Sequence, residues 1–387
     1  MKKPKIRFYG FNDDWEQRKA KELCSIGTGK SNTQDQVDDG KYPFYIRSDV
    51  PVRSNKYLYD CEAVITIGDG NIGKVFHYVN GKFDLHQRCY KMTDFQDIWG
   101  EYFFYYFSTK FYNRAMKMTA KATVDSVRLE MISEMDIQKP HHISEQKQIA
   151  EFFATLDNLI TLHQRKCDEV KKMKKYMLQN MFPQDGEKVP KIRFGGFTDD
   201  WEQRKLEDWG TFYYGHSCPK WSVTADATTP CIRYGELYTK FGTKIDRIFS
   251  YTNMPTEKLR FSKGKEVLIP RVGEDPMDYN HCTWLSMPDV AIGEMISVFN
   301  TEQDPLFTAT MFNATLQKEF AMRVEGGSVT NLYFEKLKNI EVSFPKKEEQ
   351  KKIARFFEEI DNLITLHQRK CDELKNMKKY MLQNMFV

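Results

Sequence analysis

Three groups of residues have the types found in known chemical sites, and one of them also has the spacing. The first, Gly68-Asp69-Gly70-Asn71-Ile72-Gly73, fits the G-x-G-x-x-G pattern of nucleotide-binding and S-adenosylmethionine-binding loops and follows a strand-like stretch. Such a loop needs a helix to begin at its end, where backbone amides meet a phosphate. Here residues 74–79 read as a strand, and Asn80-Gly81 predicts a hairpin turn after it. We therefore expect a glycine turn in a β-module and not a cofactor loop.

The other two groups have unsuitable spacing. Gly27-Thr28-Gly29-Lys30-Ser31 resembles the end of a P-loop, but the first glycine of that motif would fall at Cys24. The third group has the residue types of a zinc site, but their spacing matches no common zinc pattern: His216, Cys218, Cys231, His281 and Cys282. Neither an Asn-Pro-Pro-aromatic motif nor a convincing Asp…Glu-x-Lys nuclease cluster is found. We expect a chain without catalytic chemistry, metal or cofactor.

The elements that carry these residues are arranged as a tandem duplication. Residues 146–182 and 350–386 are identical at 30 of 37 positions, at a shift of 204. Residues 4–19 and 190–205 repeat at a shift of 186. The segments between the copies have diverged much further. A repeated scaffold around two different modules suggests a molecule that engages two non-identical halves of one target.

Each copy of the first repeat predicts one long helix. Apolar residues recur every three or four positions, close to heptad spacing, without Gly or Pro inside the pattern. Ser144 is the expected N-cap and Pro183 follows the end. At about 1.5 Å per residue the helix is roughly 57 Å long, and its apolar face needs a partner. We expect two long antiparallel coiled-coil helices with this core: Ile149, Phe153, Leu156, Ile160, His163, Cys167, Val170, Ile353, Phe357, Ile360, Ile364, His367, Cys371 and Leu374.

The duplication also predicts where the chain ends lie. Phe182 leads through a short linker into residues 190–201, so by equivalence Phe386 should lie beside residues 4–15. We therefore expect neighbouring termini and a pseudo-twofold arrangement. The repeated apolar residues should pack the joints between module and helix: Ile6, Phe8, Trp15, Ile192, Phe194 and Trp201.

The fold class expected from these patterns is α+β. Each module shows short strands rich in Val, Ile and Tyr, then one aromatic helix, at about residues 95–113 and 306–320. Two mixed α/β modules would thus be joined by the two long helices. The expected segments are an N-terminal repeat segment 1–22, a module 23–143, a helix 144–182, a linker and repeat segment 183–208, a module 209–345 and a helix 346–387.

Size and composition agree with a modular protein. The 387 residues allow two to three domains. A net charge of +4 and a pI near 8.4 permit nucleic-acid binding without arguing for it. The eight cysteines form no C-x-x-C pair, and no apolar signal region starts the chain, which indicates reduced thiols in a cytoplasmic protein. No apolar run approaches the roughly 18–20 residues of a membrane helix.

The whole layout resembles the specificity subunit of type I restriction-modification systems. The stretches that carry the resemblance are the repeat at residues 194–204, the helix at 349–386 and, within the modules, residues 64–76 (VITIGDGNIGKVF) and 229–238 (TPCIRYGELY). The duplicated helix is the most specific of them. One departure is that residues 140–146, which lead into the first helix, are offset by one residue from 345–350.

The resemblance implies a function and a set of partners. Two target recognition domains would each read one half of a bipartite, asymmetric double-stranded DNA site, and the helices would set the spacer between the halves. The helices would also dock two copies of an adenine-N6 methyltransferase subunit. Two ATP-dependent restriction/translocase subunits would join through them, although the sequence leaves their presence open. The subunit itself would be non-catalytic.

For DNA contact we select basic and aromatic residues from the module loops. Arg47 and Arg233 are favoured because they stand at equivalent positions at the shift of 186. Donor and acceptor patterns in the major groove distinguish all four base pairs, whereas phosphate contacts set register and salt dependence. The selected residues are Lys30, Arg47, Arg53, Lys56, Lys74, His86 and Arg88 in the first module, and Lys220, Arg233, Tyr234, Lys240, Lys265 and Arg271 in the second.

Two alternative functions stay open. The chain could be a DNA-independent coiled-coil adaptor, which sequence-selective, salt-dependent DNA binding would exclude. It could also be a fused DNA methyltransferase that uses Gly68–Gly73, which S-adenosylmethionine binding by the isolated chain would support. Lysines on the helix surface are equally consistent with methyltransferase docking and with a solvated coiled-coil face: Lys166, Lys171, Lys172, Lys174 and Lys175.

Overall fold

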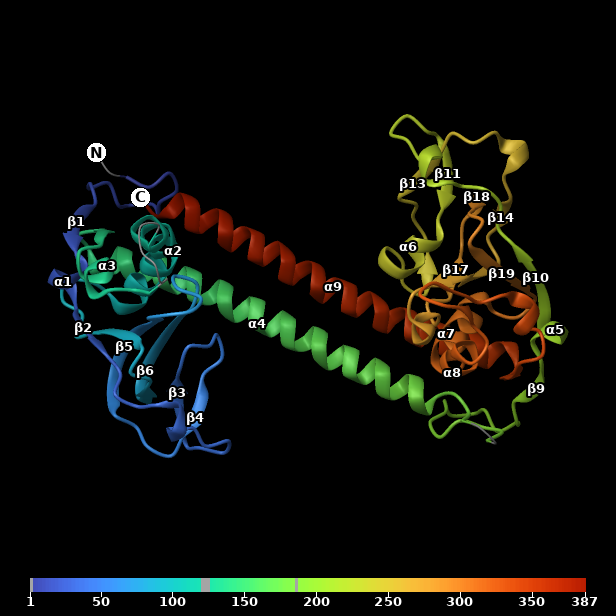
Figure 1. Cartoon of the computed structure of the whole chain (residues 1–387), viewed down its shortest axis with the longest axis horizontal. Helices are drawn as coiled ribbons and strands as arrows, with labels where there is room; N and C mark the ends of the chain where they lie inside the picture. The colour runs from blue at the N-terminus through green and yellow to red at the C-terminus, as the bar shows by residue number, and fades with distance from the viewer. Residues whose placement is uncertain (1–2, 120–125, 185–186) are drawn as a thin grey trace. The chain divides into compact units, whose positions relative to one another are not determined.

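The computed structural model describes residues 3–119, 126–184 and 187–387 (Figure 1). The chain divides into two compact units, Met1–Gln164 with Arg369–Val387, and Arg165–Gln368. Within the described residues no helix is both long and apolar enough to cross a membrane. Each unit contains one module and part of each long helix, so each is described by itself.

The first unit is built on a six-stranded sheet in the order β2-β7-β5-β6-β3-β4. All neighbouring pairs are antiparallel except β3 and β6, which are parallel. Both faces of this sheet are packed, because Val64 and Met92 belong to the large hydrophobic cluster of this unit, whereas the alternating positions Ala63, Ile65 and Ile67 belong to a separate cluster. The strands are β2 (Ser25–Thr28), β3 (Tyr42–Tyr45), β4 (Val52–Ser54), β5 (Tyr59–Ile67), β6 (Phe76–Leu85) and β7 (Cys89–Thr93).

One aromatic helix, α2 (Gly100–Thr119), covers this sheet and joins it to the long helices. Phe103, Phe107 and Phe111 stack along it, with Phe103 and Phe107 centroids 5.5 Å apart. Their cluster includes residues of both long helices, so the module and the helix ends share one core. The smaller elements are β1 (Glu16–Lys19), α1 (Ala20–Leu23), a 3-10 turn (Thr33–Asp35), α3 (Leu129–Ser133) and β8 (Asp136–Lys139), where β1 pairs with β8.

The second unit divides its strands among several sheets. A five-stranded sheet has the order β10-β19-β15-β17-β12 and a four-stranded sheet the order β13-β11-β18-β14. The first comprises β10 (Gly210–Tyr214), β12 (Lys244–Ile245), β15 (Glu266–Pro270), β17 (Thr283–Leu285) and β19 (Ile296–Thr301). The second comprises β11 (Thr229–Ile232), β13 (Ser250–Thr252), β14 (Phe261–Lys263) and β18 (Pro288–Ile292).

Shorter elements complete this unit. Helix α7 (Pro305–Thr315) is the counterpart of α2, with Asp304 as its N-cap and Phe307 and Phe312 in the core. The others are β9 (Glu202–Lys205) paired with β22 (Glu341–Phe344), β16 (Val272–Gly273), β20 (Glu325–Gly326), β21 (Thr330–Asn331), α5 (Leu206–Trp209), α6 (Tyr234–Thr239), α8 (Gln317–Ala321) and 3-10 turns at Lys220–Ser222, Thr256–Lys258, Pro276–Asp278 and Phe334–Lys336.

The two long helices, α4 (Ile143–Asn180) and α9 (Lys347–Met385), run antiparallel to each other within each unit. In the first unit Lys378 bonds Asp157 at 2.5 Å, and Cys371 Sγ lies 4.0 Å from the Ile160 carbonyl. In the second unit the same contacts join Lys174 to Asp361 and Cys167 to Ile364. The pairs differ by 204 in both members, so the duplicated sequences make duplicated contacts.

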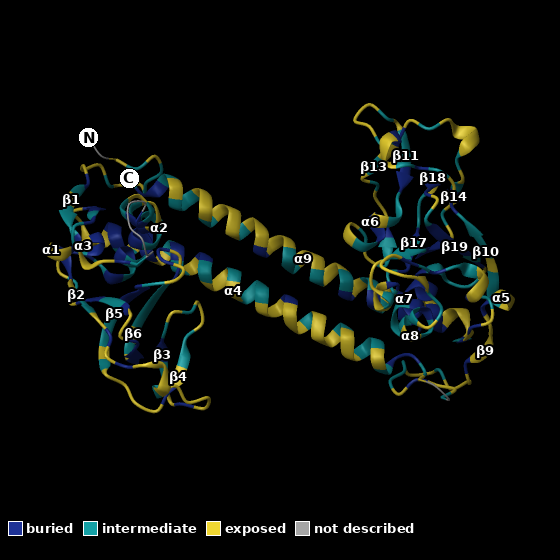
Figure 2. Cartoon of the chain, in the orientation of Figure 1, coloured by how far each residue is buried: buried dark blue, intermediate teal, exposed yellow. Residues whose placement is uncertain are grey.

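The predicted core residues of the helix pair are all buried or half-buried (Figure 2). They do not all serve the helix pair. Ile149, Phe153 and Leu156 belong to the same cluster as α2, and Ile353, Phe357 and Ile360 to the cluster of α7. The N-terminal third of each helix is therefore part of a module core, and the pairing of helix with helix is made mainly by residues further along, such as Cys167 and Cys371.

The joints between module and helix repeat as the duplication predicts. The Ile6 amide donates to the Asn384 carbonyl at 3.0 Å, and the Ile192 amide to the Asn180 carbonyl at 2.9 Å. The beginning of the chain therefore lies against the end of α9. The repeated apolar residues pack here: Trp15 and Trp201 are buried, and Ile6, Phe8, Ile192 and Phe194 are half-buried against the cores.

Some predicted boundaries are wrong. Asn80-Gly81 is no turn: it lies inside β6, opposite Glu62 and Cys61, and the hairpin turns at residues 68–75. Helix α4 begins at Ile143, with the His142 carbonyl accepting from the Gln146 amide, so Ser144 is not the N-cap. Helix α2 begins only at Gly100 because Asp94 and Asp97 have positive φ, a conformation that interrupts a right-handed helix.

Candidate nucleic-acid interface

Strand ends of the first module meet at one rim of its sheet. The end of β6 approaches the end of β2, where the Lys30 amide donates to the Leu85 carbonyl at 3.1 Å. On its other side the His86 amide donates to the Tyr45 carbonyl at the end of β3, at 3.0 Å. A side chain at Gly29 would collide with the Leu85 carbonyl, so glycine is required for this closure. The loops that follow these strands therefore gather together.

Three charged side chains pair at this rim. Asp69, in the turn after β5, accepts from Arg47 Nη1 at 3.2 Å and from Arg88 Nη1 at 2.8 Å. The glycines of the G-x-G-x-x-G motif allow this arrangement, because a side chain at Gly68 would strike the Arg88 carbonyl. Burial alone would raise the pKa of Asp69, but hydrogen bonds from Arg88 and Arg47 outweigh it and hold the pKa below its ordinary value. The carboxylate is thus ionised and fixes both guanidinium groups.

His86 lies beneath the two arginines. Its side chain is buried, and its Nδ1 accepts from the Arg88 amide at 3.1 Å. Burial, then the positive charges of Arg47 and Arg88, lower the pKa of His86. A neutral imidazole with an acceptor at Nδ1 supports the Arg88 backbone, so His86 has a positioning role rather than an exposed contact.

The remaining selected residues of the first module are placed differently. Lys30 is exposed next to the rim closure. Arg53 donates to the Gly40 carbonyl at 2.8 Å, and Lys56 pairs with Asp35 at 2.9 Å, so both are held by the segment between β2 and β4. The Lys74 ammonium lies 5.6 Å from the ring centre of Tyr112 on α2. Of the predicted set, the structure brings together Arg47, Arg88, His86 and Lys30.

The second module closes its rim with the same hydrogen bonds. The His216 amide donates to the Ile292 carbonyl at 2.7 Å, and the Gly293 amide to the Ile232 carbonyl at 2.9 Å. Gly215 repeats the part of Gly29, since a side chain there would collide with the Gly293 carbonyl. One expectation needs correction. Arg233 directly follows the last paired residue of β11, whereas Arg47 is two residues beyond the last paired residue of β3, so the two arginines are offset by one position.

Arginine and aromatic side chains occupy the neighbouring surface of the second module. The Arg271 guanidinium lies 4.8 Å from the Tyr214 ring centre and 5.7 Å from that of Tyr333. Arg260 lies 4.9 Å from the Tyr213 ring centre and donates to the Tyr214 carbonyl. Burial, then the hydrogen bond to Glu335, raises the pKa of Tyr214, so the phenol stays neutral. This surface presents arginines stacked on rings.

The other selected residues of this module are spread over its surface. Lys220, Lys240 and Lys265 are exposed, and Tyr234 is half-buried at the start of α6. The Lys240 ammonium lies over the Phe249 ring at 5.5 Å. Arg233 directly follows Ile232, whose carbonyl takes part in the rim closure, and Arg271 stacks on Tyr214, one residue before Gly215. These two arginines are therefore tied to the rim more directly than the three lysines.

Sequence patterns missed several residues of both rims. Asp69, His216, Tyr214 and Arg260 were not among the selected DNA contacts. Asp69 sits in a recognisable glycine turn, which could have marked it as a loop carboxylate, but nothing in the sequence pairs that turn with Arg88. His216 could have been found by its place one residue after Gly215, the copy of Lys30 after Gly29 at the shift of 186.

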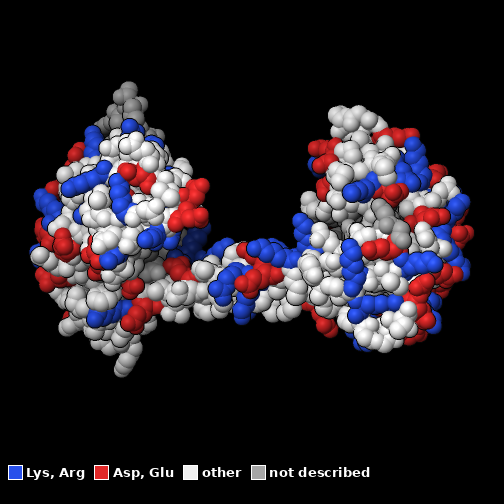
Figure 3. All heavy atoms as spheres, turned by 90° about the horizontal axis from the view of Figure 1, so that it is seen from below, with Lys and Arg blue, Asp and Glu red and all other residues white. Residues whose placement is uncertain are grey.

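The helix surface carries exposed basic and apolar side chains. Lys166, Lys171, Lys172 and Lys175 are exposed, while Lys174 is paired with Asp361. Figure 3 shows basic side chains among acidic ones on the helix pair. Large apolar residues are exposed at duplicated positions as well: Leu159 and Leu363, Met173 and Met377, Tyr176 and Tyr380.

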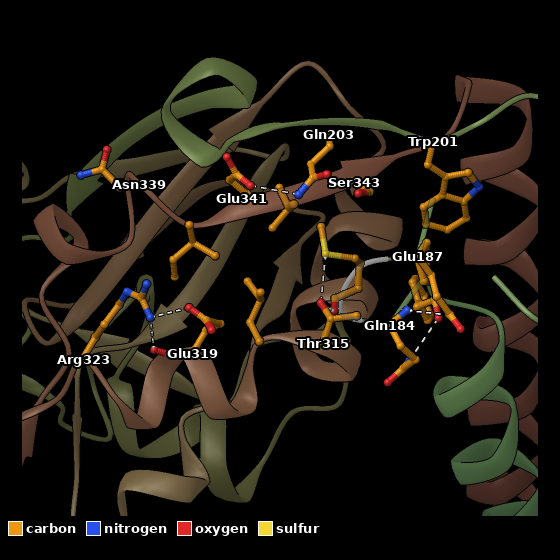
Figure 4. Close-up of a pocket in the computed structure, with 16 residues that line it drawn as sticks. Gln184, Glu187, Trp201, Gln203, Thr315, Glu319, Arg323, Asn339, Glu341 and Ser343 are labelled. Atoms are coloured by element: carbon orange, nitrogen blue, oxygen red, sulfur yellow. Dashed lines mark hydrogen bonds and ion pairs between the residues drawn. The ribbon is translucent and has the colours of Figure 1, made fainter. Parts of the chain in front are cut away.

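A pocket lies where α4 ends, between α7, α8 and β22 (Figure 4). Three pairs of its polar groups hydrogen-bond to each other. Gln203 donates to Glu341 at 3.0 Å, Arg323 to Glu319 at 2.5 Å, and the Gln184 amide to Glu187 at 3.1 Å. Figure 4 shows these pairs along the pocket wall. Since these polar groups are satisfied within the wall, the pocket has the character of a structural joint.

Comparisons with known proteins agree on one family. The model described as type I restriction modification DNA specificity domain matches residues 12–172 and 289–376. The putative type I restriction enzyme MjaX specificity subunit of Methanocaldococcus jannaschii is 24% identical, over 96% of this chain and 92% of that protein. The MjaVIII specificity subunit of the same organism is 21% identical, over 96% and 91%.

A solved structure has the same fold. The S subunit of a type I restriction-modification system from M. genitalium superposes with a TM-score of 0.69 at 13% identity, covering 100% of this chain and 99% of that chain. At this identity the likeness concerns the fold alone. The predicted architecture, two mixed α/β modules with two long antiparallel helices, is confirmed.

Proposed function

Because the chain belongs to the type I restriction-modification DNA specificity family, we propose that each of its modules reads one half of a bipartite, asymmetric DNA site. One observation carries the proposal. The same rim closure, with Gly29 in one module and Gly215 in the other, presents an Arg–Asp–Arg group in the first and aromatic-stacked arginines in the second. A shared backbone with unlike side chains is what two readers of different sequences require.

The rim residues have the chemistry of a major-groove reader. Base edges there present donor and acceptor patterns that distinguish all four base pairs, and arginine pairs bidentately with guanine. Arg47, Arg88, Arg233 and Arg271 supply donors, and Asp69 holds Arg47 and Arg88 in place. Exposed lysines near the rims, such as Lys30, are suited to phosphate contacts, which add affinity that falls as salt rises.

The helices and the domain boundaries have further roles in the proposal. We assign modules 23–143 and 209–345 as target recognition domains, residues 1–22 and 183–208 as joints, and helices 144–182 and 346–387 as the element that sets the unread spacer. Two copies of an adenine-N6 methyltransferase subunit dock on the helices, where the exposed apolar residues are duplicated. Methyl transfer, and cleavage by ATP-dependent restriction subunits where these join, belong to the partners.

The proposal is tested by the methylation pattern of the assembled complex. The chain is expressed with the adenine methyltransferase subunit of its system, and methylated adenines are mapped along the genome. The expected motif has two short specific parts separated by an unspecified spacer of fixed length. Arg271→Ala should alter one part only. Methylation without sequence preference, or a contiguous motif, would refute the proposal.

The DNA-independent adaptor is tested in the same material. Binding of labelled duplexes by the complex is measured between low and moderate salt. A target reader should prefer its own duplex over a scrambled one and lose affinity steeply with salt. Equal and salt-independent retention of both duplexes would favour the adaptor.

A further inference from the structure

The Arg47–Asp69–Arg88 group is unusual for a surface that has only to attract DNA. Two guanidinium groups share one carboxylate, with Asp69 accepting from both through separate Nη1 atoms. The side chains of Arg47 and Arg88 are 44% and 61% exposed, and Asp69 is 23% exposed. The group therefore faces outward, with the carboxylate as its less accessible centre.

Each arginine keeps donors available. Arg47 and Arg88 use only Nη1 in their pairing, so Nε and Nη2 of both have no protein acceptor among the described residues. A guanidinium held at one nitrogen can still present two parallel N–H groups from its remaining edge. Fixing the group by Asp69 lowers the conformational freedom that binding would otherwise remove.

The backbone around the group is fixed as well. The Gly68 amide donates to the Arg88 carbonyl at 2.7 Å, and the Arg88 amide donates to His86 Nδ1 at 3.1 Å. Gly70 and Gly73 have φ of 80° and 68°, which lets the turn place Asp69 against the loop that carries Arg88. Turn, histidine and carboxylate together hold Arg88 in one direction.

The charge of the group argues for bases over phosphates. Asp69 cancels one of the two positive charges and would repel a phosphate that approached both arginines. A phosphate contact gains most from an unpaired cation, whereas a base edge rewards donors placed at fixed positions. Guanine presents two acceptors, O6 and N7, in the major groove, while adenine presents an acceptor and a donor. A donor-only guanidinium therefore matches guanine.

We propose that the first module reads guanine through the Arg47–Asp69–Arg88 group, in which the arginines contact the base and Asp69 is a positioning residue. The inference rests on the proposed function and adds the base class to it. The second module differs at the corresponding turn, where the shift of 204 places Gly273 opposite Asp69. It is therefore expected to read its half by other contacts, among them the ring-stacked Arg271.

The test uses the full chain in complex with its methyltransferase subunit. The motif of the wild-type complex is first obtained from mapped methylation. Duplexes are then made that carry this site and single-base replacements at every specific position, and their dissociation constants are measured. Wild type should discriminate against replacement of a guanine in one half by about 10- to 100-fold, the range of one bidentate contact.

Two variants separate base recognition from charge and from folding. Arg88→Lys keeps the charge and should lose most of the guanine discrimination while the dependence on salt is unchanged. Asp69→Asn should lose about 10-fold of the same discrimination while affinity for unrelated DNA is maintained or increased, which a folding defect would not produce. Arg18→Lys, at an arginine of β1 that pairs with Glu16 and Glu22, is the matched control and should behave as wild type.

The possible results separate guanine reading by this group from the proposed reading of a bipartite site by two modules. Loss of discrimination at a guanine in one half only, in Arg88→Lys and Asp69→Asn, supports the proposal. If the motif is bipartite and both variants discriminate at each of its guanines as well as wild type does, the guanine inference is overturned. The two-reader function would then still stand. A wild-type complex without a bipartite preference would remove both.

Discussion

The backbone amide of Ile6 donates a hydrogen bond to the carbonyl of Asn384 over 3.0 Å, near opposite ends of the chain. The same bond joins Ile192 to Asn180 in the middle of the chain, at 2.9 Å. The first is made between segments that are far apart in sequence, and the second across a short linker. A joint that the chain makes once with a covalent linker is therefore made again without one.

Phe386 packs the joint between the N-terminal repeat segment and the end of α9, and removing its ring should destabilise the first unit. Phe386 stacks on Phe153 at 5.5 Å and contacts Tyr102 and Tyr106 edge-on. Phe386→Ala leaves a cavity in this core, and we expect a loss of about 3–5 kcal/mol in the free energy of unfolding of this unit. Urea denaturation followed by tryptophan fluorescence measures it.

Two further variants make that result interpretable. Phe182→Ala, which empties the duplicate site against Phe357, should cost a similar amount in the second unit. Tyr380→Ala, at an exposed position of the same helix, should change stability by only about 0.5 kcal/mol. A small effect of Phe386→Ala with a large effect of Phe182→Ala would mean that the joint between the N-terminal repeat segment and α9 does not form in solution.

A buried ion pair ties each repeat segment to a long helix. Arg7 binds Glu145 bidentately at 2.7 and 2.9 Å, and Arg193 binds Glu349 at 2.7 and 2.8 Å. Glu145 is fully buried and Arg7 is 11% exposed. Glu145→Gln leaves a guanidinium without its counter-charge, so we expect a loss of about 3–5 kcal/mol by denaturant titration.

The double variant provides the control for this pair. Arg7→Leu with Glu145→Leu removes both charges and should cost clearly less than Glu145→Gln alone, because no charge is left unpaired. If the double variant were the less stable of the two, the unpaired charge would not be the cause.

Mild acid should weaken the first module through His86. Its pKa is lowered by burial and by the two arginines, so below the unfolded value of about 6.5 the unfolded chain binds more protons than the folded one. The free energy of unfolding therefore falls as pH decreases from about 6.5 toward the folded pKa, by at most about 1.4 kcal/mol per pH unit. Denaturation at a series of pH values measures the slope.

The variant His86→Asn tests whether His86 causes the dependence of stability on pH. His86→Asn can still accept from the Arg88 amide but does not titrate, so its stability should change less between pH 6.5 and 5. Part of the slope should remain, since burial lowers the pKa of His77 as well. Parallel pH profiles for wild type and variant would show that His86 does not contribute.

Salt dependence should separate Lys30 from the arginine group. An exposed lysine beside the rim is suited to a phosphate, so Lys30→Ala should reduce the slope of log affinity against log salt by about one and weaken all duplexes alike. Dissociation constants of the complex over a salt series give the slope. A base-specific loss with an unchanged slope would make Lys30 a base contact instead.

The scaffold was the part of the fold that sequence could predict. Helices α4 and α9 and their joints appear twice, and a repeated heptad pattern without Gly or Pro has few alternatives. The module strands were predicted less well. Asn80-Gly81 is a local turn signal, but the pairing of Tyr59 with Phe83 carries β6 straight through it. A tertiary pairing here overrides a two-residue preference.

Of the candidate site, sequence alone indicates only residues whose own type suggests DNA contact. Arg47 and Arg88 were selected as basic loop residues. Asp69 was not, because its role depends on a turn folding onto a loop 19 residues away. The one-residue offset between Arg47 and Arg233 is likewise a matter of strand register, which an ungapped alignment does not contain.

If one duplicated scaffold holds two independent readers of DNA, replacing one module should change only the half of the target that this module reads. The most direct test replaces the second module, residues 209–345, by a second copy of the first, residues 23–143, and maps methylated adenines made by the chimera with its methyltransferase subunit. We expect a symmetric motif in which the half read by the first module occurs twice, in inverted orientation. Methylation that keeps the asymmetric wild-type motif would contradict it.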